Sequence, residues 1–403
     1  MRKIILATGI LAAALSCTQA TYEYVDYDTF RVTSVNNAPV AMPDGTINPE
    51  IRFMEDPEPD TRVASTTVVT MAKDLLGSIR SNDLVHICGT YKGHDIDGSE
   101  LIQSGKLLLP KDGPVKNLII VSHFTIGANY ECPTEAFPLE GALAAKGYAV
   151  AIADYIGFGI TSARIHPYMH VESTARSVVD MALAVKPYLE HIGRKPESDK
   201  VILVGYSQGG STTMAVMKMI QNEYSGILPI KKVYAGGGPY DLAVTYDYSM
   251  ELDATGIPCA IPMIVQGVSV GDNLHLNMGD FFQPKLLANY DSWINSKQYT
   301  VKEINTLIDA KSLHEIMTAE GRDKTSPQTA RLYKALMLNS VLNFYPEAPV
   351  YMFHSQDDET VPFANALRAE QYFKGTNIHF DFNHYGKHGT GCVRFLIKVS
   401  EEL

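Results

Sequence analysis

The chain lacks the charge pattern of a nucleic-acid-binding protein. Its 34 lysine and arginine residues are outnumbered by 45 aspartate and glutamate residues, which gives a net charge of -11. No run of basic residues forms a local patch. Such a surface repels a phosphate backbone, so we expect no nucleic-acid partner.

Cysteine is scarce as well, with five residues in a chain of 403 and no C-x-x-C pair. A cysteine-based metal cage is therefore not expected. Four cysteines lie beyond the first segment of the chain: Cys88, Cys132, Cys259 and Cys392. In an oxidising compartment this even set could form disulfides, and as thiols they would be small buried hydrophobic side chains. Both interpretations stay open.

Metal and nucleotide motifs are incomplete. His166 and His170 have the spacing of two ligands on a helix, but Pro167 between them favours a loop. Gly157 and Gly159 lack the third glycine of a dinucleotide-binding loop. We therefore predict no metal site and no cofactor.

Residues 1–20 have the character of a signal peptide. Two basic residues precede the apolar run 4–15, whose 12 residues fall short of the roughly 20 that span a bilayer and fit a signal-peptide core. Cys17 ends a stretch that resembles a bacterial lipobox, and its lipidation would anchor the mature chain to a membrane. Cleavage after Ala20 would instead release a soluble protein. We predict export, as a lipoprotein of the bacterial cell envelope or as a periplasmic or secreted protein.

The rest of the chain alternates between strand and helix signals, with one interruption. Residues 21–83 are polar and proline-bearing and are interpreted as a tether that wraps part of the body, with a helix at 65–80. Strands are expected at 84–91, 101–109, 118–122, 148–153, 200–205, 232–236, 349–353 and 377–382, and helices at 133–146, 172–192, 208–224, 363–373 and after residue 388. Residues 240–345 lose the strand signals, and we predict that they form an inserted helical cap between the core segments 84–239 and 346–403. The predicted fold class is α/β, a mostly parallel central sheet flanked by helices.

One pentapeptide in the chain matches a motif that contains a catalytic serine. Residues 205–209 read Gly-Tyr-Ser-Gln-Gly and match G-x-S-x-G. The match is informative because an apolar strand precedes it and a helix of small residues follows it. A sharp strand-to-helix turn holds such a serine in a strained conformation with its hydroxyl exposed. Ser207 is therefore the predicted nucleophile.

A serine hydroxyl needs a base, and the base needs a carboxylate that orients it. In this arrangement they follow the serine in the order acid, then histidine. Asp357 and Asp358 lie in the loop after one late strand, and His384 and His388 lie after the next. Both loops come at the carboxyl ends of strands, where an open α/β sheet places its site.

From residue 84 to the end, the chain resembles the α/β-hydrolase superfamily, and within it the secreted lipase and esterase branch with a helical cap. The resemblance selects Asp358, four residues before Pro362 in a Val-Pro pair, and His388, followed by glycine before the last helix. It implies an oxyanion hole made by the backbone N–H groups of Gln208 and of Thr125, with Phe124 as the alternative to Thr125.

These residues predict an esterase or lipase that acts on a small-molecule or lipid ester through an acyl-enzyme intermediate. A serine peptidase of the prolyl-oligopeptidase type uses the same triad, but the segment before residue 84 is too short for the propeller that such enzymes often carry. A ligand-binding lipoprotein with a decayed site is a second alternative, and transfer of the acyl group to an alcohol is a third. The oligomeric state does not follow from the sequence.

Overall fold

The structure is a computed structural model that describes residues 27–38, 51–52, 84–253 and 256–403. The signal peptide 1–20, the lipid-anchor candidate Cys17 and the helix expected at 65–80 lie outside the described residues.

The core of the molecule is a nine-stranded sheet in the order β1-β3-β4-β7-β5-β8-β9-β10-β11. Its strands are β1 (Arg31–Ala38), β3 (Leu84–His94), β4 (Glu100–Pro110), β5 (Leu118–Ser122), β7 (Ala149–Ala153), β8 (Val201–Tyr206), β9 (Ile230–Gly236), β10 (Val350–Ser355) and β11 (Ile378–Asn383). Every pairing from β7 across to β11 is parallel, whereas β1, β3 and β4 join in antiparallel register. A mostly parallel sheet, as the sequence predicts, is therefore confirmed.

The central strands are parallel because their sequences suit burial on both faces. All residues of β5, β7 and β8 are buried, and such strands read as continuous apolar runs. At the edge, β1 is different, because it is polar and mostly exposed and pairs only with β3. The sequence analysis placed these residues in the tether and missed the strand.

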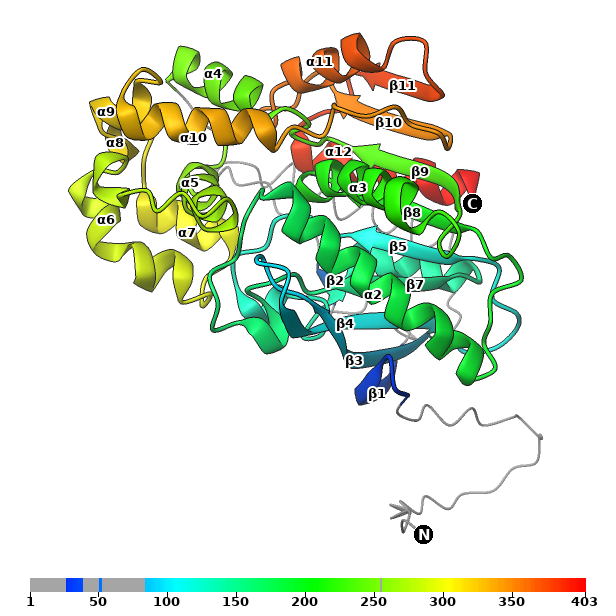
Figure 1. Ribbon diagram of the computed structural model, residues 1–403. Helices are drawn as coiled ribbons and strands as arrows, with labels where there is room; N and C mark the ends of the chain where they lie inside the picture. Colours follow the sequence, from blue (N-terminus) through cyan, green and yellow to red (C-terminus); the bar gives the residue numbers. More distant parts are fainter. Residues whose placement is uncertain (1–26, 39–50, 53–83, 254–255) are drawn as a thin grey trace, which may run out of the picture.

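Helices cover both faces of the sheet (Figure 1). On one face α2 (Val171–His191), α3 (Gln208–Met219) and α11 (Ala364–Phe373) share one apolar core with the strands. On the other face α12 (His388–Glu402) and the 3₁₀ segment η2 (Leu139–Lys146) share a second core. The α/β layer architecture follows from this two-sided burial.

The helix expected at 133–146 is wrong in its first half. Residues Phe137–Pro138 form the short strand β6, which pairs with β2 (Ile51–Arg52), and only Leu139–Lys146 is helical, as a 3₁₀ segment. Pro138 has no N–H to donate, which disfavours a helix that runs through this position. The alanine and leucine spacing was real, but it spans only the second half of the stretch.

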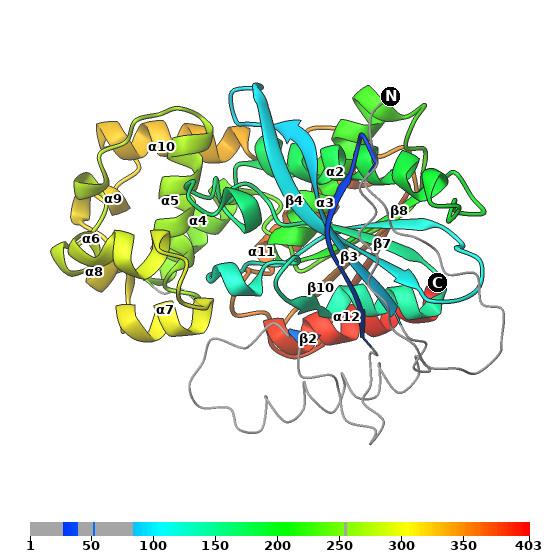
Figure 2. The ribbon, with the colours of Figure 1, turned by 90° about the horizontal axis from the view of Figure 1, so that it is seen from below.

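Between β9 and β10 the described residues form helices joined by loops, with one isolated antiparallel bridge between Phe282 and Met317. The helices are α4 (Leu242–Leu252), α5 (Ala260–Gly271), α6 (Pro284–Tyr290), α7 (Val301–Ile308), α8 (Leu313–Ile316), α9 (Ala319–Arg322) and α10 (Pro327–Leu338). These helices gather at the left of the sheet in both views (Figures 1 and 2) and share a core of their own, which also takes in Tyr168 and Met169 from the loop after β7. We call residues 240–345 the helical segment below.

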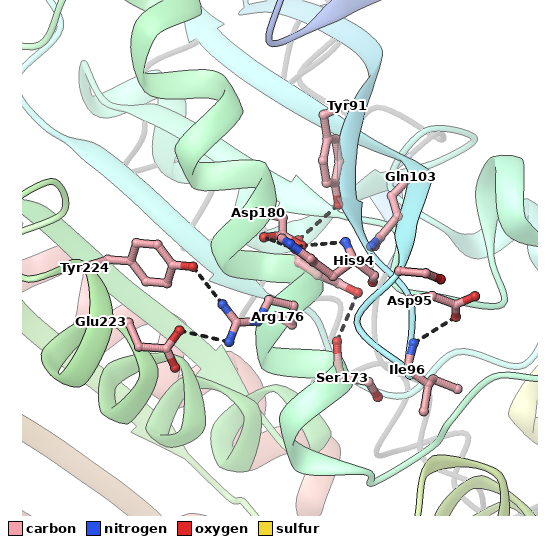
Figure 3. Close-up of polar contacts among 12 residues, drawn as sticks. Tyr91, His94, Asp95, Ile96, Gln103, Ser173, Arg176, Asp180, Glu223 and Tyr224 are labelled. Atoms are coloured by element: carbon pink, nitrogen blue, oxygen red, sulfur yellow. Dashed lines mark hydrogen bonds and ion pairs between the residues drawn. The ribbon is translucent and has the colours of Figure 1, made fainter. Parts of the chain in front are cut away.

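The far end of the β3–β4 hairpin is fastened to α2 by buried polar groups (Figure 3). The buried carboxylate of Asp180 accepts hydrogen bonds from the backbone N–H of His94 (2.9 Å) and from its Nδ1 (3.0 Å). Gln103 donates to the carbonyl oxygen of His94, and Tyr91 donates its hydroxyl to the carbonyl of Ser177 on α2. Burial raises the pKa of Asp180 even though His94 acts in the opposite direction.

The four cysteines of the described part of the chain are buried thiols outside any disulfide. Of the two interpretations that the sequence left open, the structure therefore has the small buried side chains. Among the helices of the described ranges, none combines the length and the apolar character that crossing a bilayer requires.

Candidate active site

Ser207 lies at the sharp turn between β8 and α3. Its backbone has φ 60° and ψ -125°, a strained conformation for a residue with a side chain. Its N–H donates to the carbonyl of Gly236 on β9 (2.9 Å), and only 4% of the residue is exposed. The turn has the geometry that the pentapeptide predicted.

The two glycines of the pentapeptide are required by close backbone approaches. A Cβ on Gly205 would collide with the carbonyl oxygen of Gly209, and a Cβ on Gly209 would collide with the carbonyl oxygen of Ser122 at the end of β5. The first turn of α3 therefore lies directly against the loop that begins after β5.

His388 and Asp358 meet Ser207 from two other loops. His388, the first residue of α12, has its Nε2 2.8 Å from the Ser207 hydroxyl oxygen. Its Nδ1 lies 2.6 Å from Oδ2 of Asp358, which follows β10. Tyr206 donates its hydroxyl to the carbonyl of His388 (2.9 Å), which ties the start of α12 to the serine turn. The structure thus brings together all three residues selected from the sequence.

Asp358 is held in one orientation by its own loop. Its Oδ1 accepts the backbone N–H groups of Thr360 (2.9 Å) and Val361 (2.8 Å). Burial alone would raise the pKa of this carboxyl group, but the facing His388 and these hydrogen bonds hold the pKa below its usual value. Asp358 therefore remains an anion that can orient and stabilise an imidazolium.

The rejected candidates pair with each other at the surface. His384 and Asp357 approach to 2.7 Å through Nδ1 and Oδ1, with side chains 73% and 43% exposed. Two acid–histidine pairs thus arise from the same two loops, and only the buried one faces the serine.

The loop after β5 carries both candidates for the second oxyanion donor. His123 donates from Nδ1 to the carbonyl of Phe124 (2.7 Å), since an imidazole nitrogen that faces a carbonyl must carry its hydrogen. Thr125 and Tyr168 are joined through their hydroxyl groups (2.7 Å). The loop adjoins Gly209, so Phe124 and Thr125 both lie near the start of α3, where Gln208 is the first residue.

Two buried histidines near the site make contacts that the sequence analysis did not predict. His354 donates from Nε2 to the carbonyl of Val361 (3.1 Å), and the same atom lies 3.7 Å from Oδ2 of Asp358. His166 contacts the side chain of Gln208, with 3.2 Å between their Nε2 atoms. Neither contact follows from spacing in the sequence, because each depends on how loops fold back. Within the described ranges, no group of three potential ligands could hold a metal ion.

The loop after β7 is built around Asp154. This buried carboxylate accepts from Ser104 (2.6 Å) and from both the N–H (2.9 Å) and the hydroxyl (2.7 Å) of Thr134. A Cβ on Gly159 would collide with the Asp154 carboxylate. These contacts of Asp154 therefore fix the shape of the loop after β7.

The helical segment contacts the loops that surround the serine. A Cβ on Gly127, after β5, would collide with backbone at Tyr299 and Val301, and a Cβ on Gly267 would collide with backbone at Tyr168, after β7. Gly256 is in similar close contact with the carbonyl of Glu359, which follows β10. Three of the site's loops therefore pack against one helical body.

The known proteins that this chain resembles include lipases and an esterase. The secretory lipase family matches residues 133–392. The secreted triacylglycerol lipase LIP1 of Malassezia furfur is 22% identical over 261 residues, which cover 62% of this chain and 50% of that protein. The chain thus spans about half the length of this curated relative.

Solved structures share the fold. The rice cell wall degrading esterase LipA of Xanthomonas oryzae superposes with a TM-score of 0.71 at 24% identity, over 82% of this chain and 94% of that one. Candida antarctica lipase A gives a TM-score of 0.57 at 16% identity, over 78% of this chain and 75% of that one. The α/β-hydrolase fold expected from the sequence is therefore confirmed.

Proposed function

The chain belongs to the secretory lipase family, and from this premise we propose that it hydrolyses carboxylic esters with Ser207 as nucleophile, His388 as general base and acid, and Asp358 as the orienting carboxylate. The observation that carries the proposal is the continuous hydrogen-bonded chain from Asp358 Oδ2 to His388 Nδ1 (2.6 Å) and from His388 Nε2 to Ser207 Oγ (2.8 Å).

In the first step Ser207 attacks the ester carbonyl carbon while Nε2 of His388 takes the hydroxyl proton. The carbonyl oxygen becomes an oxyanion, and His388 then returns the proton to the leaving alcohol. Water next attacks the acyl-enzyme, with His388 again as base, and the acid leaves as Ser207 is restored. Asp358 stabilises the imidazolium in both steps without taking up its proton.

The oxyanion needs two fixed N–H donors. The backbone N–H of Gln208 is the first, because it directly follows the nucleophile at the start of α3. We propose Thr125 for the second, with Phe124 as the alternative donor in the same loop. Loss of one such donor lowers kcat by roughly 10²–10³.

For the substrate we propose lipid esters, in keeping with the secreted triacylglycerol lipase among the relatives. The helical segment 240–345 is proposed as a cap, supported by its contacts with the loops after β5, β7 and β10. Export through the signal peptide 1–20, with Cys17 as a lipid anchor, completes the proposal. An acyl-chain-length series on p-nitrophenyl esters tests the substrate, and a preference for acetate over long chains would contradict the lipid assignment.

The experiment that tests the chemistry compares Ser207→Ala with the wild type. We expect turnover of p-nitrophenyl esters and labelling by a fluorophosphonate probe to be abolished together. Ser225→Ala, in a turn beyond α3, is a matched control that keeps both. Substantial esterase activity in Ser207→Ala would contradict the proposal.

A further inference from the structure

The side chain of Gln208 is as deeply buried as the nucleophile beside it. Only 2% of the residue is exposed, and its amide nitrogen Nε2 lies 3.2 Å from Nε2 of His166, 42 residues away along the chain. The catalytic steps above use only the backbone N–H of Gln208. Its side chain therefore has a partner that those steps leave unexplained.

The direction of this hydrogen bond follows from the other nitrogen of His166. Nδ1 of His166 lies 2.6 Å from the carbonyl oxygen of Ile156, which can only accept, so Nδ1 carries the hydrogen. Burial lowers the pKa of His166 to about 3, which keeps the ring neutral. Nε2 then has a lone pair, and Gln208 donates to it through its NH₂ group.

The ring of His166 is fixed on several sides. It lies parallel to the ring of Tyr155, with centroids 6.1 Å apart, and contacts the rings of Phe158 (5.0 Å) and Tyr168 (5.8 Å). Its backbone also packs against Gly157 so closely that a Cβ there would collide with it. An acceptor held this firmly can restrain a side chain that binds to it.

His166 lines a small cavity beside the site. The cavity it lines, between the loop after β7 and the helical segment, has a volume of about 20 Å³. That is room for a single water molecule. Across this cavity Lys297 of the helical segment donates from Nζ to the carbonyl of Ser162 (2.6 Å), which ties the loop of His166 to the helices. The contact of His166 with the residue that follows Ser207 is its hydrogen bond with Gln208.

We propose that His166 is a positioning residue that holds the side chain of Gln208 and thereby keeps the Gln208 backbone N–H directed at the oxyanion. This inference rests on the proposed ester hydrolysis through Ser207. Because a donor aimed at the oxyanion acts on the transition state and much less on the bound ester, loosening it lowers kcat and leaves KM nearly unchanged.

Two substitutions of His166 separate positioning from packing. In His166→Gln the side-chain amide reaches the place of Nε2 and offers an acceptor to Gln208. In His166→Asn the shorter amide reaches only the place of Nδ1, where it can donate to the carbonyl of Ile156. Both variants are polar and smaller than histidine, so a simple packing role makes the loss of activity follow the loss of Tm in both, whereas a positioning role lowers kcat in His166→Asn by more than its Tm accounts for.

We expect His166→Asn to lower kcat about 10-fold, with KM within twofold of the wild type, and His166→Gln to recover most of that loss. The concentration of competent enzyme is fixed by titration with a fluorophosphonate, and Tm is measured for each variant. Gln208→Met, which keeps the backbone N–H, should lower kcat as much as His166→Asn. The double variant should lower it no further, since both changes break one interaction.

Equal kcat in His166→Asn and the wild type would overturn the inference, as would losses in Asn and Gln that follow Tm alone or additive losses in the double variant. If His166→Asn does not fold, Gln208→Met tests the same bond from the other side. Ser207→Ala separates this result from the proposed function. An active Ser207→Ala defeats both, whereas an inactive Ser207→Ala beside a fully active Gln208→Met defeats only the role of His166.

Discussion

In the described part of the chain, the buried carboxylates of Asp358 and Asp180 each hold a histidine through its Nδ1, and the histidine of the Asp358 pair faces the hydroxyl of Ser207. In the first pair, His388 lies 2.6 Å from Asp358 and 2.8 Å from Ser207. In the second, His94 lies 3.0 Å from Asp180 at the end of the β3–β4 hairpin (Figure 3). Each carboxylate also accepts backbone N–H groups, so distance alone does not distinguish the two pairs.

The difference lies on the other side of the imidazole. His388 has a side chain 3% exposed and presents Nε2 to the hydroxyl of Ser207, whereas the His94 side chain is 49% exposed. Water screens a charge on His94, so burial prevails and raises the pKa of Asp180, while the pKa of Asp358 is lowered. The pair that we propose as catalytic is therefore distinguished by its burial and its facing hydroxyl, and the other pair ties the hairpin to α2.

The largest expected effect separates the two pairs by activity. Asp358→Asn should lower kcat by roughly 10⁴, because the amide no longer stabilises the imidazolium or holds its tautomer. Asp180→Asn should keep kcat per folded molecule within about threefold. Steady-state kinetics on a p-nitrophenyl ester, normalised by active-site titration, checks both. Similar losses of kcat in the two variants would show that the Asp358 pair and the Asp180 pair do not differ in their importance for catalysis.

The second prediction concerns the stability that the Asp180 pair contributes. Asp180→Ala leaves the N–H of His94 and the imidazole without their acceptor, and we expect a loss of about 1–3 kcal/mol in the free energy of unfolding. Thermal and urea denaturation measure it. Glu190→Ala, on the exposed side of the same helix, is the control and should change stability by less than about 0.5 kcal/mol. An unchanged Tm in Asp180→Ala would contradict the role of Asp180 as a tie.

The pH dependence of stability should have opposite signs for the two carboxyl groups. Because the folded-state pKa of Asp358 is lowered, its ionised form stabilises the fold above the unfolded-state pKa of about 3.9, and this contribution is lost at lower pH. The folded-state pKa of Asp180 is raised, so its contribution falls as pH increases above about 3.9. The stability lost in Asp358→Asn should therefore grow with pH, and that lost in Asp180→Asn should shrink. Urea denaturation at a series of pH values tests this, and slopes of the same sign would refute it.

The smallest effects come from two matched tyrosines. Tyr206→Phe and Tyr91→Phe each remove one buried hydroxyl that donates to a carbonyl, that of His388 and that of Ser177. Both should cost about 0.5–1.5 kcal/mol of stability. Only Tyr206→Phe should also lower kcat, by a few-fold, because it frees the start of α12. An equal kcat in both variants would show that His388 needs no such support.

The sequence predicted most of the sheet because its buried strands are short apolar runs bounded by turn residues. The run 118–122 coincides with β5, and Ser207 could be located because its motif lies between a strand and a helix. The edge strand β1 could not, since Arg31–Ala38 is polar and becomes a strand only by pairing with β3. Asp358 was separated from Asp357, and His388 from His384, by resemblance to a family, because in each case both residues lie in the same loop.

His166 and His354 are residues whose contacts could not be predicted from the sequence. Each is buried beside a residue of the site, and each acts through a contact made when a loop closes on itself. No periodicity marks such a residue, because its partner's distance along the chain is arbitrary. Asp180 is a similar case, since its partner His94 lies 86 residues away.

The proposed acid and base, Asp358 and His388, follow β10 and β11, the last strands at one side of the sheet, whereas Ser207 follows the central strand β8. Among the described strands β11 lies at this edge and pairs with β10 alone, so we expect fraying on heating to begin there. If the proposed function holds, ester turnover reports the docking of the C-terminal strands: we expect it to fade on heating while the middle of the sheet still resists exchange of its amide hydrogens with deuterium.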